Sequence, residues 1–368
     1  MSLRRIGASA GLSLLALAAG LLCGMLVLAV AGKDVGAALD ALWSGSVATP
    51  AALTESMRQA VPITIAGLGV AFALRAGLFN IGANGQLYIG ALCAVLVGLS
   101  VTGLPTVLVL VLALLAGAAG GGAWGAIPGA MRSRRGMNEV ITTLLLNFVA
   151  FWIVSWAVHG PLLDESGGGN PWTRPVAAEL GRVTIGSLAI PVGLLVAVGL
   201  AAALALIVNR TALGFELRLV GDNPVAAAAA GVPTGRRTVQ ALAISGLLAG
   251  VAGAVELLAF QHRLSDFFSP SYGFTAIAVA LVGNGRVLGT VLAGLFFGAL
   301  QAGAGAMEAI AQIPAAMTLV VQGAIVLFLV AAQAPAVSAR FSRLLRRRRR
   351  TPQPAAATIT QAASGASS

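Results

Sequence analysis

The sequence predicts an all-α protein that crosses a membrane many times. Of its 368 residues, 58% are hydrophobic and only 10% are charged, too few to cover the surface of a soluble fold. The apolar residues form runs of about 20, the length that a helix needs to cross about 30 Å of hydrocarbon. Arginines gather in alternate loops between these runs, which is the pattern of the positive-inside rule. These three observations exclude the soluble fold classes.

Ten apolar runs follow one another, and each predicts a transmembrane helix. The first follows Arg4 and Arg5 and ends in Ala29-Val30-Ala31, which has the small-x-small form of a signal-peptide cleavage site. Because this run is long for a signal peptide and further spans follow, we expect it to be retained. The ten predicted spans are residues 11–31, 61–74, 79–99, 104–131, 140–158, 185–208, 239–260, 272–283, 287–307 and 314–333.

The charged loops predict an even number of spans with both termini in the cytoplasm. Acidic residues occupy most of the loops that this arrangement places outside. The loops placed inside carry arginines instead: Arg75, Arg132, Arg134, Arg135, Arg210, Arg218, Arg236, Arg237 and Arg286. The net charge of +11 therefore reflects membrane topology, and we expect no nucleic-acid partner.

Two of the predicted spans, 61–74 and 272–283, are short and flanked by glycine and polar residues. Short, interrupted segments at matching places in two halves indicate a transport site. They are the second and eighth spans, so we hypothesise two five-helix halves related by an inverted repeat. Residues 1–333 form the predicted transmembrane domain. Residues 334–368 form a cytoplasmic tail, predicted to be disordered after Arg346–Arg350, a run that stops translocation and attracts anionic lipid.

Three amides, Asn80, Asn84 and Gln86, lie within seven residues directly after an apolar run. Polar groups at membrane depth must be satisfied by protein, by water in a cavity or by a solute. Amides suit a neutral polyhydroxylated solute because each offers a donor and an acceptor without a buried charge. The alternative is that these residues form a cytoplasmic turn with Arg75.

A second polar segment begins the predicted span 140–158. Glu139 is expected in the first helical turn, where the helix dipole favours a carboxylate, and it could pair there with Arg134 or Arg135. Thr143 and Asn147 continue along the embedded part of the helix, with Asn147 near the helical face of Glu139. The segment therefore offers either pathway residues or a plain helix start.

A short cytoplasmic helix is predicted within residues 221–231. Asn223 is a favoured N-cap, Pro224 a favoured first residue, the alanines after it propagate a helix and Gly231 ends it. Its side chains are small and arginines flank it. Such a smooth surface can fit a groove on a partner protein, although a plain connector is the alternative.

Four motifs together resemble one known family. They are Gly77-Leu-Phe-Asn-Ile-Gly-Ala-Asn-Gly-Gln86, Asn138-Glu-Val-Ile-Thr-Thr143, Gly221-Asp-Asn-Pro-Val-Ala-Ala227 with Gly231, and Tyr272-Gly-Phe-Thr-Ala-Ile-Ala-Val-Ala-Leu-Val-Gly283. In this order they resemble the ABC-importer permeases of the nucleoside and simple-sugar group, which are related to ribose and branched-chain amino acid permeases. The resemblance runs from about residue 61 to residue 333. Acidic residues are common in that family at the position of Asn84, which bears on substrate preference.

The resemblance implies a transport subunit and its sites. Residues predicted near the substrate pathway are Asn80, Asn84, Gln86, Glu139, Thr143, Asn147 and Thr275. Residues predicted at the ATPase contact are Gly221, Asp222, Asn223, Ala226, Ala227 and Gly231. The implied partners are cytoplasmic ATPase subunits, a second permease chain in a hetero- or homodimer, and an extracytoplasmic solute-binding lipoprotein at the inner membrane of a bacterium.

The expected function is import of a nucleoside or related small polar solute by alternating access. The sequence carries no phosphate-binding loop of the Gly-x4-Gly-Lys-Ser/Thr type, so ATP hydrolysis is assigned to a separate subunit, and no enzyme activity, cofactor or metal is expected. A simple-sugar permease is the first alternative. An ion-coupled secondary transporter is the second, and Glu256 would then be the candidate coupling group as an acid well inside a predicted span.

Overall fold

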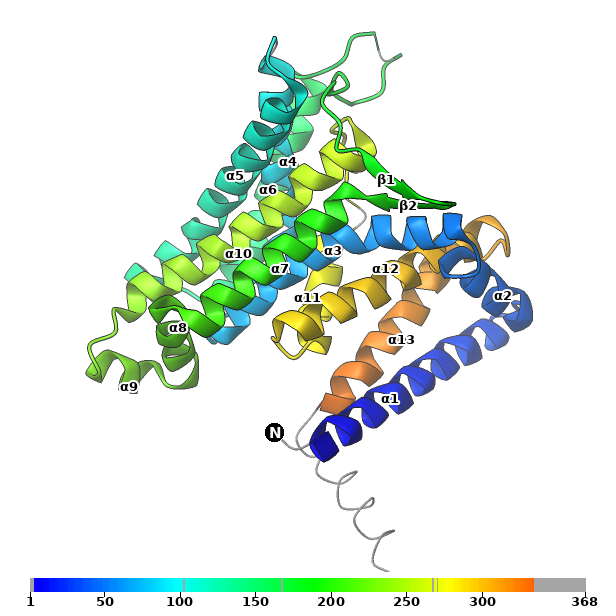
Figure 1. Cartoon of the computed structure of the whole chain (residues 1–368), viewed down its shortest axis with the longest axis horizontal. Coiled ribbons are helices and arrows are strands. Elements are labelled where there is room, and N and C mark those ends of the chain that lie inside the picture. The colour runs from blue at the N-terminus through cyan, green and yellow to red at the C-terminus, as the bar shows by residue number, and fades with distance from the viewer. Residues whose placement is uncertain (1–2, 102, 167, 267, 270, 334–368) are drawn as a thin grey trace, which may run out of the picture.

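The computed structural model describes the backbone of residues 3–101, 103–166, 168–266, 268–269 and 271–333, and side chains from Leu15 onward except at 315 and 333. The predicted tail 334–368, with Arg346–Arg350, lies outside the described residues. The first part of the fold is helical (Figure 1). It comprises α1 (Leu3–Val30), α2 (Val35–Ser46), α3 (Pro50–Arg75), α4 (Ala83–Ser100), α5 (Thr106–Arg135) and α6 (Glu139–His159).

An antiparallel hairpin of β1 (Arg182–Ile185) and β2 (Leu188–Pro191) separates this part from the remaining helices, with Ile185 paired to Leu188 at the turn. After it come α7 (Val192–Arg210), α8 (Ala212–Asp222), α9 (Pro224–Ala229), α10 (Thr234–Glu256), the π-helix η1 (Leu257–Gln261), α11 (Tyr272–Val282), α12 (Val287–Ala309) and α13 (Ala315–Gln333). The sequence did not predict α2, the hairpin or a separate α8.

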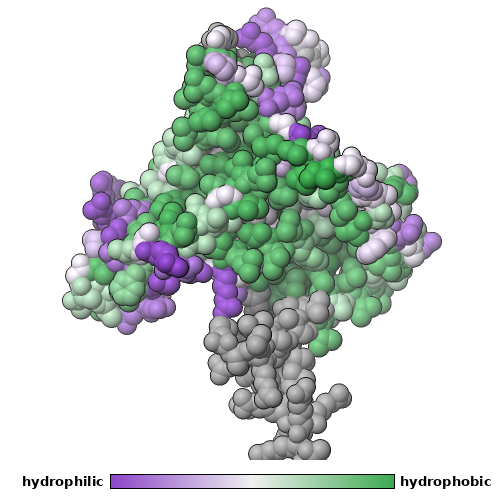
Figure 2. Space-filling model, in the orientation of Figure 1, coloured by the Kyte–Doolittle hydropathy of each residue, from purple (hydrophilic) through white to green (hydrophobic). Residues whose placement is uncertain are grey.

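Within the described residues, seven helices are long and apolar enough to cross a membrane: α3, α4, α5, α6, α7, α10 with η1, and α12. The described apolar stretches of α1, α11 and α13 are shorter. The surface between the polar ends is mostly hydrophobic (Figure 2). The prediction of a polytopic helical membrane protein is therefore confirmed.

The second predicted span is longer than the sequence suggested. α3 has 26 residues, and after its N-cap Thr49 it begins at Pro50, 11 residues before the predicted start at residue 61. Its first turns contain charged and polar residues, but partners within the fold satisfy them. The Ser56 hydroxyl donates to the Ser46 carbonyl oxygen at 2.6 Å, and Arg58 pairs with Glu55. The prediction of a short second span is wrong, whereas α11, with 11 residues, is short as predicted.

α3 and α10 form the centre of the bundle, and most side chains along their apolar stretches are buried. α10 packs against α5 and α4, while α3 packs against α12 and α11. Glycine makes the closest of these approaches possible. A Cβ on Gly121 of α5 would lie 2.3 Å from the Gly246 carbonyl oxygen of α10, and one on Gly250 would lie 2.2 Å from the Gly117 carbonyl oxygen. Backbones in direct contact maximise van der Waals packing, which replaces the hydrophobic effect between helices in lipid.

Arginines gather at one end of the bundle, which we call the arginine-rich end and define by Arg75, Arg132, Arg218, Arg237 and Arg286. Contacts between distant segments connect these positions. Arg75 Nε donates to the Gly285 carbonyl oxygen at 2.8 Å, and Arg237 Nε to Glu216 at 2.6 Å. The opposite end carries acids such as Asp164, whose pair with Arg263 measures 3.1 Å. The fold therefore brings these arginines to one end of the bundle, as the sequence indicates, and acids such as Glu216 pair with some of them there.

Candidate functional site

The turn between α3 and α4 is held by a closed network of side chains. Gly77 has a φ of 70°, which a glycine adopts without strain and which lets the chain reverse. Asn80 is fully buried, and its side-chain oxygen accepts the Gly82 N–H at 2.9 Å. Its amide nitrogen donates to Gln86 Oε1 and to Ser245 Oγ, both at 2.8 Å. Because Ser245 belongs to α10, this network fixes the turn to the centre of the bundle.

Two polar residues of α6 hold the same turn from another side. Asn147 Nδ2 donates to the Ile81 carbonyl oxygen at 2.9 Å, and its Oδ1 accepts the Gly85 N–H at 2.7 Å. The Thr143 hydroxyl accepts the Ile81 N–H at 3.3 Å. These bonds satisfy backbone groups that have no helical partner, so the non-helical stretch is tolerated inside the bundle.

Glu139 begins α6, as predicted, after the N-cap Asn138. Its carboxylate is paired with Arg132 rather than with Arg134 or Arg135. α5 continues as a helix to Arg135, beyond the predicted end of its span, and this brings Arg132 opposite Glu139. The pair lies at the arginine-rich end and ties the end of α5 to the start of α6.

The first turns of α4 and α11 lie against each other. A Cβ on Gly273 of α11 would lie 2.2 Å from the backbone nitrogen of Asn84 in α4, so the two first turns touch. Helix N-termini carry partial positive charge and N–H groups without helical partners. The Asn84 Oδ1 atom there is buried and has no hydrogen-bond partner within the described residues. Thr275 is half-buried one turn along α11, and its hydroxyl donates to the Ser271 carbonyl oxygen at 3.3 Å.

The short helix predicted within 221–231 is α9. Asn223 caps it by accepting the N–H groups of Val225 at 3.1 Å and Ala226 at 3.0 Å. Gly231, with a φ of 83°, follows its end. Ala227 is buried against the rest of the chain, whereas the Val225 side chain is 78% exposed. The run of small residues in the sequence could not show which face of α9 is exposed.

Gly221 connects this helix to the turn between α3 and α4. A Cβ on Gly221, near the end of α8, would lie 2.2 Å from the Arg75 carbonyl oxygen and 3.0 Å from the Gly77 nitrogen. Asp222 is exposed and is the last residue of α8, directly before the cap of α9. Backbone therefore lies against backbone between α8 and the α3–α4 turn.

Comparison with known proteins decides the family. Residues 52–330 match the family described as the permease component of the branched-chain amino acid transport system. The chain belongs to this permease family. It is 36% identical to the guanosine ABC transporter permease of Bacillus subtilis, over 87% of this chain and 93% of that protein. It is 35% identical to a glucose ABC transporter permease of Haloferax volcanii, over 88% and 87% of the two chains. A nucleoside ABC transporter permease of Lactococcus lactis is 30% identical, over 86% and 89%.

The permease is thus a transport subunit of the ABC type, which favours an ATP-driven importer over an ion-coupled transporter. Its predicted pathway residues fall into three groups in the structure. Asn80, Gln86, Thr143 and Asn147 form one buried network. Asn84 and Thr275 lie where α4 and α11 begin, and Glu139 lies at the arginine-rich end.

Removal of the Asn80 amide is expected to destabilise the permease. Asn80→Leu leaves the buried Ser245 hydroxyl and the Gln86 amide without this partner, and an unsatisfied buried polar group costs about 1–3 kcal/mol. We expect a lower thermal unfolding midpoint in detergent and less protein in the membrane. The double variant Asn80→Leu/Ser245→Ala should recover part of the loss, because one orphaned group is removed. An unchanged midpoint for Asn80→Leu would contradict the network.

A second buried polar cluster lies around Glu256, the acid that the sequence placed inside a span, and its partners were not predicted. Glu256 is fully buried, its Oε1 accepts the Gln261 amide at 3.0 Å, and Arg58 Nη1 lies 3.9 Å away. The Tyr272 hydroxyl donates to Gln59 Oε1 at 2.7 Å and so connects α11 to α3. Charged residues inside apolar runs are a signal of such a cluster, but partners nearly 200 positions apart cannot be matched from one sequence.

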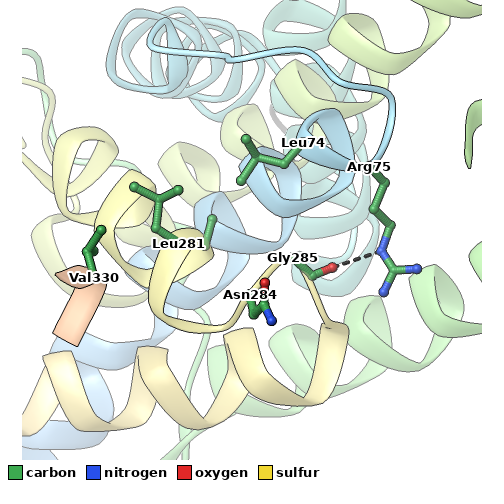
Figure 3. Close-up of a pocket in the computed structure, with 7 residues that line it drawn as sticks. Leu74, Arg75, Leu281, Asn284, Gly285 and Val330 are labelled. Carbon is green, nitrogen blue, oxygen red and sulfur yellow. Dashed lines mark hydrogen bonds between the residues drawn. The ribbon is translucent and has the colours of Figure 1, made fainter. Parts of the chain in front are cut away.

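A pocket opens at the arginine-rich end (Figure 3). It has a volume of about 530 Å³ and lies between the ends of α3 and α11, with α13 forming a third wall. Its lining residues are Leu74, Arg75, Ala280, Leu281, Asn284, Gly285 and Val330. None of them was among the predicted site residues, because no local motif marks a place where three helix ends meet.

Proposed function

We propose that the permease imports a nucleoside or a related small polar solute by alternating access, as the membrane subunit of an ATP-binding-cassette importer. The observation that carries this proposal is the junction of α4 and α11, where the Asn84 oxygen is buried without a partner among the described residues. A neutral acceptor beside two helix N-termini suits a solute with hydroxyl and amide groups and no net charge. The similarity to guanosine and nucleoside permeases supports the same solute class.

A simple sugar is the second candidate, because the glucose permease of Haloferax volcanii is 35% identical. The two candidates can be separated in cells that express the whole importer and lack other uptake routes. We expect labelled nucleoside uptake that excess glucose does not compete for. Glucose uptake without nucleoside uptake would replace the nucleoside by a sugar and leave the importer assignment intact.

Asn84 is the residue that we expect to affect transport without affecting the fold. Its side-chain oxygen has no described protein partner, so Asn84→Leu breaks no hydrogen bond through that atom. If the oxygen accepts a hydrogen bond from the solute, its loss should lower uptake about 5- to 30-fold, the equivalent of about 1–2 kcal/mol. Initial uptake rates would be compared at equal membrane abundance. Unchanged kinetics would remove Asn84 from the pathway.

We also propose that all ten apolar helices span the membrane as two inverted halves with both termini inside. α3 to α6 would correspond to α10 to α13. Two observations support this correspondence. α3 packs on α12 and α11, and in the same way α10 packs on α5 and α4. The two central helices also run in opposite directions, because α3 ends at the arginine-rich end and α10 begins there. In this correspondence the short α11 matches α4 and not the second span. The start of α1 and the end of α13 lie at one end of the structure (Figure 1).

The proposed partners follow from the same assignment. ATPase subunits would dock on α9 at the cytoplasmic end, a second permease chain would complete the pathway, and a lipoprotein would deliver the solute from outside. The gathering of arginines in alternate loops supports this orientation in the plasma membrane of a bacterium. Closure of the ATPase subunits would move α9 and, through Gly221, the α3–α4 turn.

A further inference from the structure

The pocket at the arginine-rich end combines two kinds of lining (Figure 3). Leu74, Ala280, Leu281 and Val330 form an apolar wall from three helices. The rim is polar and comes from Arg75 and from the turn that contains Asn284 and Gly285. A site that is apolar on one side and cationic on the other fits an amphiphilic anion better than a wholly hydrophilic one.

Positive charges gather around the rim. Arg218 and Arg286 lie close enough to Arg75 for their charges, which have the same sign, to act on its guanidinium. Arg75 Nε is held by the Gly285 carbonyl oxygen at 2.8 Å, which directs the rest of the guanidinium away from that turn (Figure 3). Like charges held near one another repel, so a bound anion would stabilise this arrangement.

The turn of the rim is built tightly. Asn284 and Gly285 both have positive φ angles, 52° and 60°. Their N–H groups donate to the carbonyl oxygens of Leu281 at 2.9 Å and Ala280 at 3.1 Å, so the turn is tied back to the end of α11. A non-glycine residue with positive φ is uncommon and persists only where its surroundings impose it. The asparagine amide is therefore presented at the mouth of the pocket by a fixed backbone.

We propose that this pocket binds the phosphate of an anionic phospholipid, with the first part of an acyl chain against Leu74, Leu281 and Val330. Arginines beside a membrane-spanning bundle attract anionic headgroups, and basic pockets between helices at the cytoplasmic face bind them specifically. The volume of about 530 Å³ lies within the usual size of a small-molecule site. The lipid would brace the end of α3, whose Arg75 carbonyl oxygen lies against Gly221.

The test uses the full chain in nanodiscs of phosphatidylcholine, with or without phosphatidylglycerol. Thermal unfolding midpoints are measured in both, and lipid retained after detergent extraction is counted by native mass spectrometry. We expect Arg75→Gln, which removes the charge that lines the rim, to weaken phosphatidylglycerol binding about fivefold, from about 1 kcal/mol per charge near an anionic headgroup. Val330→Trp, which fills the apolar wall and keeps every arginine, should lower retention too. The matched control is Arg134→Gln, an exposed arginine in the last turn of α5.

Each outcome decides the proposal. It stands if phosphatidylglycerol raises the unfolding midpoint of the unmodified chain and of Arg134→Gln, but much less that of Arg75→Gln and Val330→Trp. It fails if Arg134→Gln loses as much as Arg75→Gln, because the attraction would then be diffuse. It also fails if inorganic phosphate or glycerol phosphate stabilises the chain as much as the lipid does, because the site would then take a free phosphate. Equal midpoints in plain phosphatidylcholine confirm that the variants are folded.

Discussion

Val225→Arg is expected to abolish stable association of the ATPase subunits with the permease. The Val225 side chain is 78% exposed on α9, where Asn223 and Pro224 fix the start of the helix. An exposed apolar side chain on a capped helix is suited to fill a pocket of a partner. An arginine would instead carry a charge into that pocket, and the loss of such an anchor costs 2 kcal/mol or more, about a 30-fold loss of affinity.

Co-purification of the ATPase with tagged permease measures this association, and solute uptake should fall in parallel. Val183→Arg is the matched control, because Val183 is a partly exposed valine on the hairpin far along the chain from α9. Ala227 is a poorer target, since it is buried and an arginine there would disturb the folding of α9 itself. Normal yield of the ATPase with Val225→Arg would show that α9 does not form the docking surface.

Gly121→Val is expected to prevent the permease from accumulating as a folded protein. A Cβ at this position would lie 2.3 Å from the Gly246 carbonyl oxygen and 2.6 Å from the Gly250 Cα, both backbone atoms that cannot move aside alone. α5 and α10 would have to separate along their contact. Because Ser245 of α10 accepts a hydrogen bond from Asn80 in the α3–α4 turn, the damage would extend to the candidate site. Overpacking of this kind costs at least about 1–3 kcal/mol.

The matched control for this variant is Gly199→Val in α7. Gly199 is also a helical glycine, but nothing lies within 4 Å of an added Cβ. Membrane abundance and a single monodisperse peak in detergent would be compared for the two variants. If Gly121→Val accumulated as well as Gly199→Val, the close approach of α5 and α10 would be wrong.

The sequence already carried most of the local structure of the site. Asn223, Pro224 and Gly231 marked α9 because caps and breakers act on the chain next to them. Asn138 and Glu139 marked the start of α6 for the same reason. The predicted start of α3 was too late, because hydropathy cannot show that Ser56 and Arg58 have partners within the fold. The predicted start of α4 was too early, because hydropathy cannot show that the chain stays non-helical until Gly82.

By itself, the sequence determined that the chain is a helical membrane protein of the permease family and where its short helix α9 lies. These properties depend on composition, on residue order and on contacts within a few positions. Only the tertiary structure decided that Asn80 bonds to Ser245, that α4 and α11 begin side by side, and that Gly221 touches Arg75. Such contacts join residues far apart in the chain, and their energies depend on distances that no local pattern contains.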